Sequence, residues 1–89
     1  MTKSIMQSKC ECYLCGITRP LNRHHVINGV GNRDNSERYG LWVYLCPKHH
    51  EMVHTDQKLD VELKRYAQRA FGETYPDEDW MKIFHKNYL

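Results

Sequence analysis

The sequence lacks any apolar run near the roughly 20 residues that a membrane-spanning helix requires. Residues 1–7 also lack the apolar stretch of a secretory signal peptide. Both absences predict a protein that stays out of the membrane and resides in the cytoplasm. The length of 89 residues predicts a single domain. The core of such a small domain commonly needs a metal, a disulfide or a partner to be stable. In a reducing compartment, its four cysteines favour metal binding over disulfides.

A strong charge of one sign is also absent, because the formal net charge is only +2. The net charge is nevertheless uneven, since residues 16–50 hold five Lys or Arg against two Asp or Glu and are therefore net positive. A phosphate backbone is a compatible partner for such a segment, although solvated surface charge explains it equally well. Phosphate contacts are predicted for Arg23, Arg33, Arg38 and Lys48.

The order of apolar and turn-forming residues predicts an α+β fold. Residues 17–27 end in the β-branched pair Val26-Ile27, and residues 41–45 are aromatic and aliphatic throughout, so each segment predicts a strand. Residues 28–38 between them are dense in Gly and Asn and predict a loop. A loose arm (1–9), a core (10–55) and C-terminal helices packed on that core (56–89) are expected within one domain. Helices are predicted from Pro47 through His54, from Asp60 to a stop at Gly72, and from Asp77 onward.

Two short-spaced pairs of metal-binding residues stand thirty residues apart: Cys12-x2-Cys15 and Cys46-x2-His49. Structural zinc takes four tetrahedral sulfur or nitrogen ligands and commonly receives them as two such pairs. A zinc ion at this site would add folding free energy that a small core lacks. Cys10 also lies close enough to pair with Cys15, but the two-residue spacing favours Cys12.

The histidines form a second pattern, because His24 and His25 are adjacent and His54 follows His50 by four residues. That spacing places His50 and His54 on one face of the predicted helix. Since His49 belongs to the zinc pair, His50 and His54 remain for a second ion, and His24 or His25 would reach it from the strand. Buried, hydrogen-bonded imidazoles without a metal are the alternative reading.

These residues together resemble the HNH endonucleases of the ββα-metal type. The resemblance rests on Cys12-Tyr-Leu-Cys15, Arg23-His24-His25, Cys46-Pro-Lys-His49-His50 and Glu51-Met-Val-His54, and it covers residues 10 to about 55. The tail from residue 66 is also similar to small phage or prophage HNH proteins. The resemblance implies a ββα-metal motif held by zinc, with additional C-terminal helices.

The resemblance also implies a role for each histidine in the hydrolysis of DNA phosphodiester bonds. His25 would be the general base that deprotonates water, and His24, His50 and His54 would bind the catalytic cation. Mg²⁺ or Mn²⁺ is the expected ion, and three imidazoles would also accept Zn²⁺ or Ni²⁺. The roles of His24 and His25 can also be exchanged.

One departure from the family concerns its middle asparagine, which usually precedes the second zinc pair by about five residues. Residues 40–45 contain no Asn. The candidates that remain for this role, which is chiefly to orient the loop, are Asn28, Asn32 and Asn35.

Two other functions compete with the nuclease. His50-Glu51-Met-Val-His54 matches the zinc-protease pattern H-E-x-x-H, but a domain of this size has little room for a protease cleft. A non-catalytic, zinc-stabilised module that binds nucleic acid or protein would need only the Cys and His49 ligands. It would leave the other histidines without a common purpose.

Overall fold

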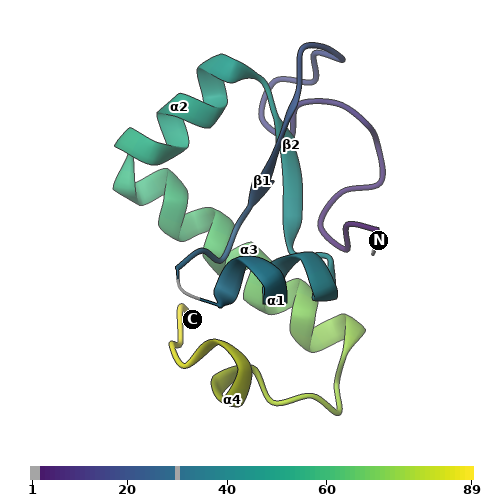
Figure 1. Cartoon of the computed structure of the whole chain (residues 1–89), viewed down its shortest axis with the longest axis vertical. Helices are drawn as coiled ribbons and strands as arrows, with labels where there is room; N and C mark the ends of the chain where they lie inside the picture. The colour runs from purple at the N-terminus through teal and green to yellow at the C-terminus, as the bar shows by residue number, and fades with distance from the viewer. Residues whose placement is uncertain (1–2, 30) are drawn as a thin grey trace.

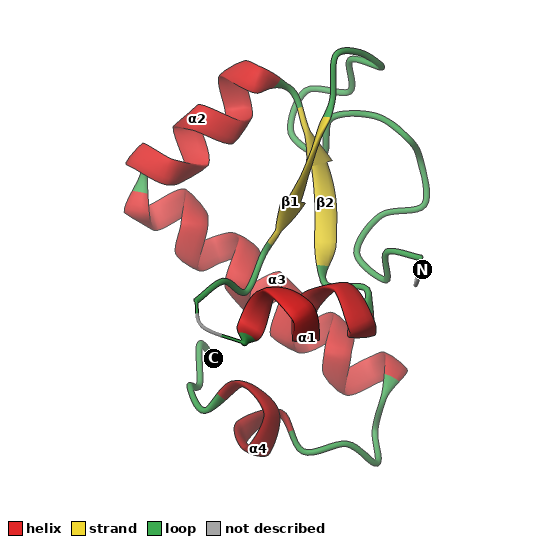
Figure 2. Ribbon diagram, viewed as in Figure 1, coloured by secondary structure: helices red, strands yellow, loops and turns green. Residues whose placement is uncertain are grey.

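The computed structural model describes residues 3–29 and 31–89. It is a small α+β fold in which helices lie along one side and at one end of a two-stranded sheet, and the N-terminal segment runs along its other side (Figures 1 and 2). Within the described residues, the elements in chain order are β1 (Asn22–His25), α1 (Asn32–Tyr39), β2 (Trp42–Leu45), α2 (Pro47–Thr55), α3 (Gln57–Thr74) and α4 (Trp80–Phe84).

The two strands pair antiparallel and sort the histidine dyad onto opposite faces of the sheet. His24 lies opposite Val43, which is fully buried, so His24 faces the core and α2. His25 lies opposite Trp42 and therefore points to the other face. The predicted strands are confirmed, but β1 is shorter than expected because Val26 and Ile27 continue into a buried turn.

Helix α2 begins at Pro47, as predicted, because proline suits a position without an intrahelical N–H bond. The cap of the next helix, α3, is Asp56, four residues before Asp60, which had been predicted to cap it. The Asp56 side chain accepts hydrogen bonds from the N–H groups of Lys58 and Leu59, at 3.1 and 3.2 Å. The predicted stop at Gly72 was wrong, since α3 continues to Thr74.

The prediction of a loop over residues 28–38 was wrong for its second half, which forms α1. Gly31 and Gly40 flank this helix with left-handed φ angles of 80° and 74°, so the glycines bracket the helix. Ser36 is fully buried and donates a 2.6 Å hydrogen bond to the carbonyl of Ile27. Tyr39 packs edge-to-face on Phe71 of α3 with ring centroids 5.3 Å apart. Tertiary contacts therefore stabilise a helix whose own residues are poor helix formers.

The last helix, α4, closes the core beneath α3. Its cap is Asp79, which accepts from the N–H groups of Met81 and Lys82, whereas Asp77 had been predicted. Trp80 and Phe84 are buried as expected, and the Trp80 ring lies 5.3 Å from the ring of Phe71. The apolar stripes of α3 and α4 thus belong to the core.

The described part of the N-terminal arm, residues 3–9, runs beside β2. The Ser4 hydroxyl donates to the carbonyl of Trp42 at 2.5 Å, and the Ile5 N–H donates to the carbonyl of Gly40 at 2.9 Å. The Tyr44 N–H donates to the Gln7 side chain at 2.9 Å. The predicted loose arm is therefore tied to the sheet from Ser4 to Gln7, and residues 1 and 2 lie outside the described part. Among the described residues, no helix is long and apolar enough to span a membrane.

Candidate metal centres

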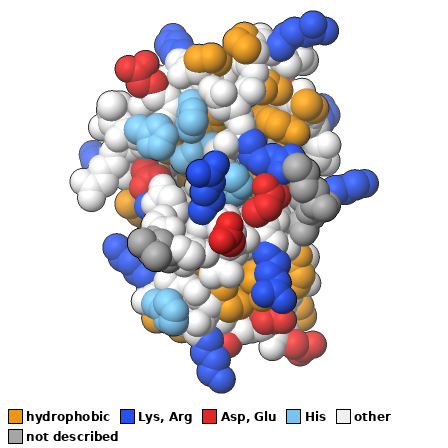
Figure 3. All heavy atoms as spheres, in the orientation of Figure 1, with side chains coloured by type: hydrophobic (Ala, Val, Ile, Leu, Met, Phe, Trp, Pro, Cys, Tyr) orange, Lys and Arg blue, Asp and Glu red, His pale blue; other side chains and the backbone are white. Residues whose placement is uncertain are grey.

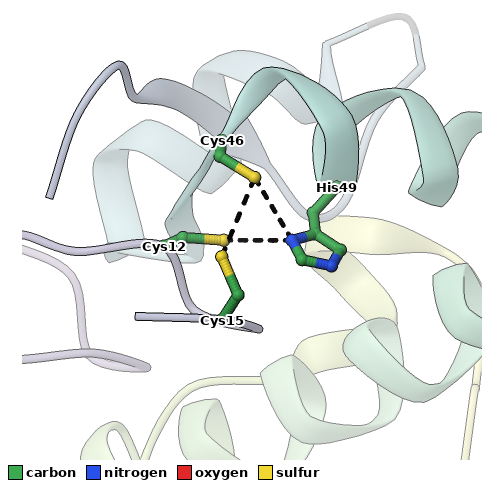
Figure 4. Close-up of side chains that lie close together, drawn as sticks. All are labelled: Cys12, Cys15, Cys46 and His49. Atoms are coloured by element: carbon green, nitrogen blue, oxygen red, sulfur yellow. Dashed lines mark hydrogen bonds between the residues drawn. The ribbon is translucent and has the colours of Figure 1, made fainter. Parts of the chain in front are cut away.

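The first cluster brings together the four predicted zinc ligands: Cys12, Cys15, Cys46 and His49 (Figure 4). Nδ1 of His49 lies 3.2 Å from Sγ of Cys46 and 3.6 Å from Sγ of Cys12, and the sulfurs of Cys15 and Cys46 are 3.9 Å apart. Tetrahedral zinc with ordinary bond lengths separates two sulfurs by about 3.8 Å and sulfur from nitrogen by about 3.6 Å. The Cys3His cluster can therefore hold an ion such as zinc.

Local hydrogen bonds shape this cluster. The Gly16 N–H donates to the carbonyl of Cys12 at 2.8 Å, and Gly16 takes the left-handed φ of 81° that closes the turn. The Tyr13 N–H donates to the carbonyl of Tyr44 at 2.8 Å, which fixes the turn to β2. Although burial raises the pKa of Cys12, backbone hydrogen bonds lower it to about 6. A thiolate at neutral pH is the form that binds metal.

Cys10 is exposed and lies outside the cluster, although both Cys10 and Cys12 are close to Cys15 in the sequence. Cys12 is 1% exposed and its sulfur points to His49. The two-residue spacing therefore selects the same cysteine as the structure does.

The second cluster joins His24 of β1 to His50 and His54 of α2. Nε2 of His50 and Nε2 of His54 are 3.3 Å apart, and the ring of His24 has its centroid 5.3 Å from that of His50 and 5.7 Å from that of His54. One nitrogen of each ring lies within 4.8 Å of the others. This separation suits three imidazoles on one metal ion.

His24 supplies an independent test of whether a metal fits this second cluster. Its Nε2 atom is buried and has no hydrogen-bond partner, and such an orphaned polar atom is costly unless a ligand satisfies it. Burial and the neighbouring His50 and His54 lower the pKa of His24 to about 4, so the ring is neutral at pH 7. Neutral imidazole is the form that ligates a metal. The residues present therefore fit an ion.

His25 is held by an acidic residue of α1. Its Nε2 lies 3.1 Å from Oε1 of Glu37, and the same carboxylate accepts 2.8 and 3.0 Å hydrogen bonds from Arg23. Although partial burial raises the pKa of Glu37, its hydrogen bonds to His25 and Arg23 hold the pKa below the usual value. Because an ionised carboxylate only accepts, Nε2 of His25 donates to Glu37, and the lone pair of a neutral ring is then on Nδ1.

A hollow of about 250 Å³ connects these groups, and its walls combine the histidines with basic residues. Figure 3 shows histidine side chains gathered on the face of α2 and β1, with basic and acidic side chains beside them. Arg38 and Lys48, which were predicted to contact phosphate, are not among the lining residues. The hollow is lined by Arg23, His24, His25, Asn28, Arg33, His50 and His54.

Glu37 is the residue that sequence reasoning missed. It stood within a predicted loop and counted only as one of two acidic residues in a basic segment. No spacing rule links it to His25, which lies twelve residues earlier. Of the three candidate asparagines, Asn28 lines the hollow, whereas Asn32 donates to the carbonyl of Asn28 at 3.2 Å.

No family model, curated protein or solved structure matches this chain. Conclusions about function therefore rest on the geometry of the two clusters.

Proposed function

We propose that the protein is a metal-dependent endonuclease of the HNH type, which hydrolyses phosphodiester bonds in DNA. The observation that carries the proposal is the approach of His24 from β1 to His50 and His54 from α2. His25 lines the same hollow, so a candidate base lies beside a candidate cation site. In this proposal the Cys3His cluster is structural, and it fixes α2 relative to β2 and to the turn from Cys12 to Gly16.

The proposed roles follow from the two ring nitrogens of His25. Glu37 fixes the Nε2–H group, which leaves Nδ1 to take a proton from water. The water oxygen then forms a bond to phosphorus while the bond from phosphorus to one sugar oxygen breaks, and solvent protonates that oxygen. His24, His50 and His54 would hold a divalent ion, which stabilises charge on the phosphate when bound.

The donor set refines the choice of ion. All three candidate ligands are imidazoles, and imidazole favours transition-metal ions over Mg²⁺, which prefers oxygen ligands. We therefore place Mn²⁺, Ni²⁺ and Zn²⁺ ahead of Mg²⁺ as activators. Arg33, which is exposed at the start of α1 and lines the hollow, is positioned to contact a phosphate.

A plasmid-nicking assay tests the function directly. The zinc-loaded protein is incubated with supercoiled plasmid and Mn²⁺, Ni²⁺ or Mg²⁺, and conversion to open circles is measured. We expect nicking that His25→Ala lowers by roughly 100-fold or more, the range typical of a lost general base. His85→Ala is the matched control, since His85 is exposed and lies outside both clusters.

The competing function is a zinc-stabilised module that binds nucleic acid or protein without cleaving it. Absence of nicking with every ion, in a protein that retains zinc and binds DNA, would favour this module and reject the endonuclease. Equal loss of nicking in His25→Ala and His85→Ala would also contradict the role of His25.

A further inference from the structure

A second hollow, of about 520 Å³, opens on the sheet face that carries Arg23 rather than on the face that carries His24. The N-terminal segment forms one wall, and the side chains of β1 and β2 form the other. Arg23 lines both this hollow and the histidine hollow, so the two adjoin. We call it the arm groove, and its lining residues are Lys3, Ser4, Gln7, Ser8, Lys9, Cys10, Arg23, Trp42 and Tyr44.

The charge of the arm groove is positive. Lys3 and Lys9 are exposed, and none of the described residues that line the groove is acidic. Arg23 contributes less net charge because Glu37 accepts two hydrogen bonds from it. The two lysines therefore carry most of the attraction for an anionic partner.

Aromatic rings form the floor of the arm groove. Trp42 is only 6% exposed, and the guanidinium of Arg23 lies 3.8 Å from its ring centroid, so this ring is already covered. Tyr44 is half-buried and meets Trp42 edge-to-face at 5.2 Å. Tyr44 is the less buried of the two rings, so it is the one that we expect to contact a planar ligand.

We propose that the arm groove binds a single strand of nucleic acid, with phosphates at Lys3 and Lys9 and an unpaired base stacked on Tyr44. Grooves that bind single strands combine cationic walls with aromatic stacking surfaces, and stacking requires a base that is not paired in a duplex. Because Arg23 lines both hollows, a nucleic-acid strand bound in the arm groove would continue into the histidine hollow. That last step rests on the proposed nuclease function, whereas binding in the groove does not.

Fluorescence anisotropy with the full-length, zinc-loaded protein tests the groove. The probe is a fluorescein-labelled oligothymidine of about 16 nucleotides, the upper end of typical site sizes, and a gel after each titration confirms that it is intact. We expect Lys3→Gln/Lys9→Gln to bind roughly tenfold more weakly and to reduce the salt slope by about 1.4, or 0.7 per phosphate contact. Lys58→Gln/Lys82→Gln removes the same charge from exposed positions outside the groove and should bind within about twofold of wild type.

Substitutions of Tyr44 test the stacking separately from the charge. Tyr44→Phe keeps the ring and should bind like the wild type, whereas Tyr44→Leu keeps apolar bulk without the ring and should bind at least about fivefold more weakly. Thermal melts and zinc content establish that each variant is folded.

Three outcomes would overturn the proposal: equal weakening by the two double lysine variants, equal binding by the two Tyr44 variants, or tighter binding of a duplex than of the single strand. The two proposals fail separately. Groove-dependent binding without any nicking rejects the nuclease alone, and nicking with unaltered binding in every groove variant rejects the groove alone.

Discussion

Glu37 is the acidic residue that contacts both a basic residue and a histidine of β1. It accepts hydrogen bonds from Arg23 and from His25, which share one face of the sheet. A carboxylate behind an imidazole fixes its tautomer and stabilises the imidazolium that forms when it takes a proton. In the proposed mechanism, Glu37 is therefore a positioning residue for His25.

Replacement of Glu37 should lower turnover without weakening substrate binding. We expect Glu37→Ala to reduce kcat by roughly 10- to 100-fold, as is typical for partners behind a functional histidine. Glu37→Gln keeps a hydrogen-bond acceptor without the charge, so its kcat should fall less than that of Glu37→Ala. The measurement is the dependence of nicking rate on plasmid concentration. A rise in KM with unchanged kcat would instead assign Glu37 to substrate binding.

Glu37 should also make stability depend on pH in a defined direction. Its pKa in the folded state is below the usual value of 4.5, chiefly because His25 and Arg23 donate to it against the opposing effect of burial. The resulting stabilisation is fully present above pH 4.5 and is lost as pH falls through the folded-state pKa. Urea midpoints of the zinc-loaded wild type and Glu37→Gln should therefore differ by a full, constant amount down to pH 4.5 and begin to converge only below it. A difference that already narrows between pH 7 and pH 5 would refute this linkage.

The elements of the fold differ in how much their own residues specify them. Helices α2 and α3 follow from local signals, namely Pro47 at the start of one and the Asp56 cap of the other. Helix α1 does not, because Asn, Asp and Ser dominate it and favour turns when isolated. Buried Ser36 and the contact of Tyr39 with Phe71 decide its structure. This is why its residues predicted a loop.

Gly40 links α1 to the N-terminal segment and gives a test at the level of elements. Its φ is 74°, and an added Cβ would collide with the carbonyl oxygen of Lys3 and come within 3.2 Å of the Ile5 nitrogen. We expect Gly40→Ala to lower the free energy of unfolding by about 1–3 kcal/mol, measured by urea denaturation.

Gly72→Ala is the matched control for Gly40→Ala. Gly72 lies inside α3 with open space where a Cβ would sit, so alanine there should raise stability by about 0.5–1 kcal/mol. Equal effects of the two substitutions would show that Gly40 has neither the left-handed φ nor the close contact with the N-terminal segment in solution.

At the level of the whole molecule, we expect the fold to depend on a metal in the Cys3His cluster, because the sheet of the described residues has two strands and the buried core is small. A metal that joins the turn from Cys12 to Gly16 to β2 and α2 should therefore supply much of the folding free energy. We expect a chelator, or Cys46→Ser, to abolish cooperative unfolding as followed by circular dichroism.

Cys10→Ser is the control for zinc dependence, since Cys10 is exposed and outside the cluster. It should bind as much zinc as the wild type, measured by elemental analysis, and should unfold at the same temperature. Loss of zinc in Cys10→Ser would show that Cys10, rather than Cys12, is the zinc ligand.

The sequence by itself determined the local pairs of candidate ligands, because a two-residue gap and a four-residue helical step place side chains together through local backbone geometry. The fold then joined these pairs into two clusters and brought His24 rather than His25 to His50 and His54. The sequence also determined the strands and the apolar stripes of α3 and α4. Only the tertiary structure decided that α1 is helical and that Glu37 contacts His25. It also decided that Arg23 and Arg33, rather than Arg38 and Lys48, line the histidine hollow. Finally, it placed the N-terminal segment along one side of the arm groove. These features depend on contacts between residues far apart in the chain, and no local spacing encodes such contacts.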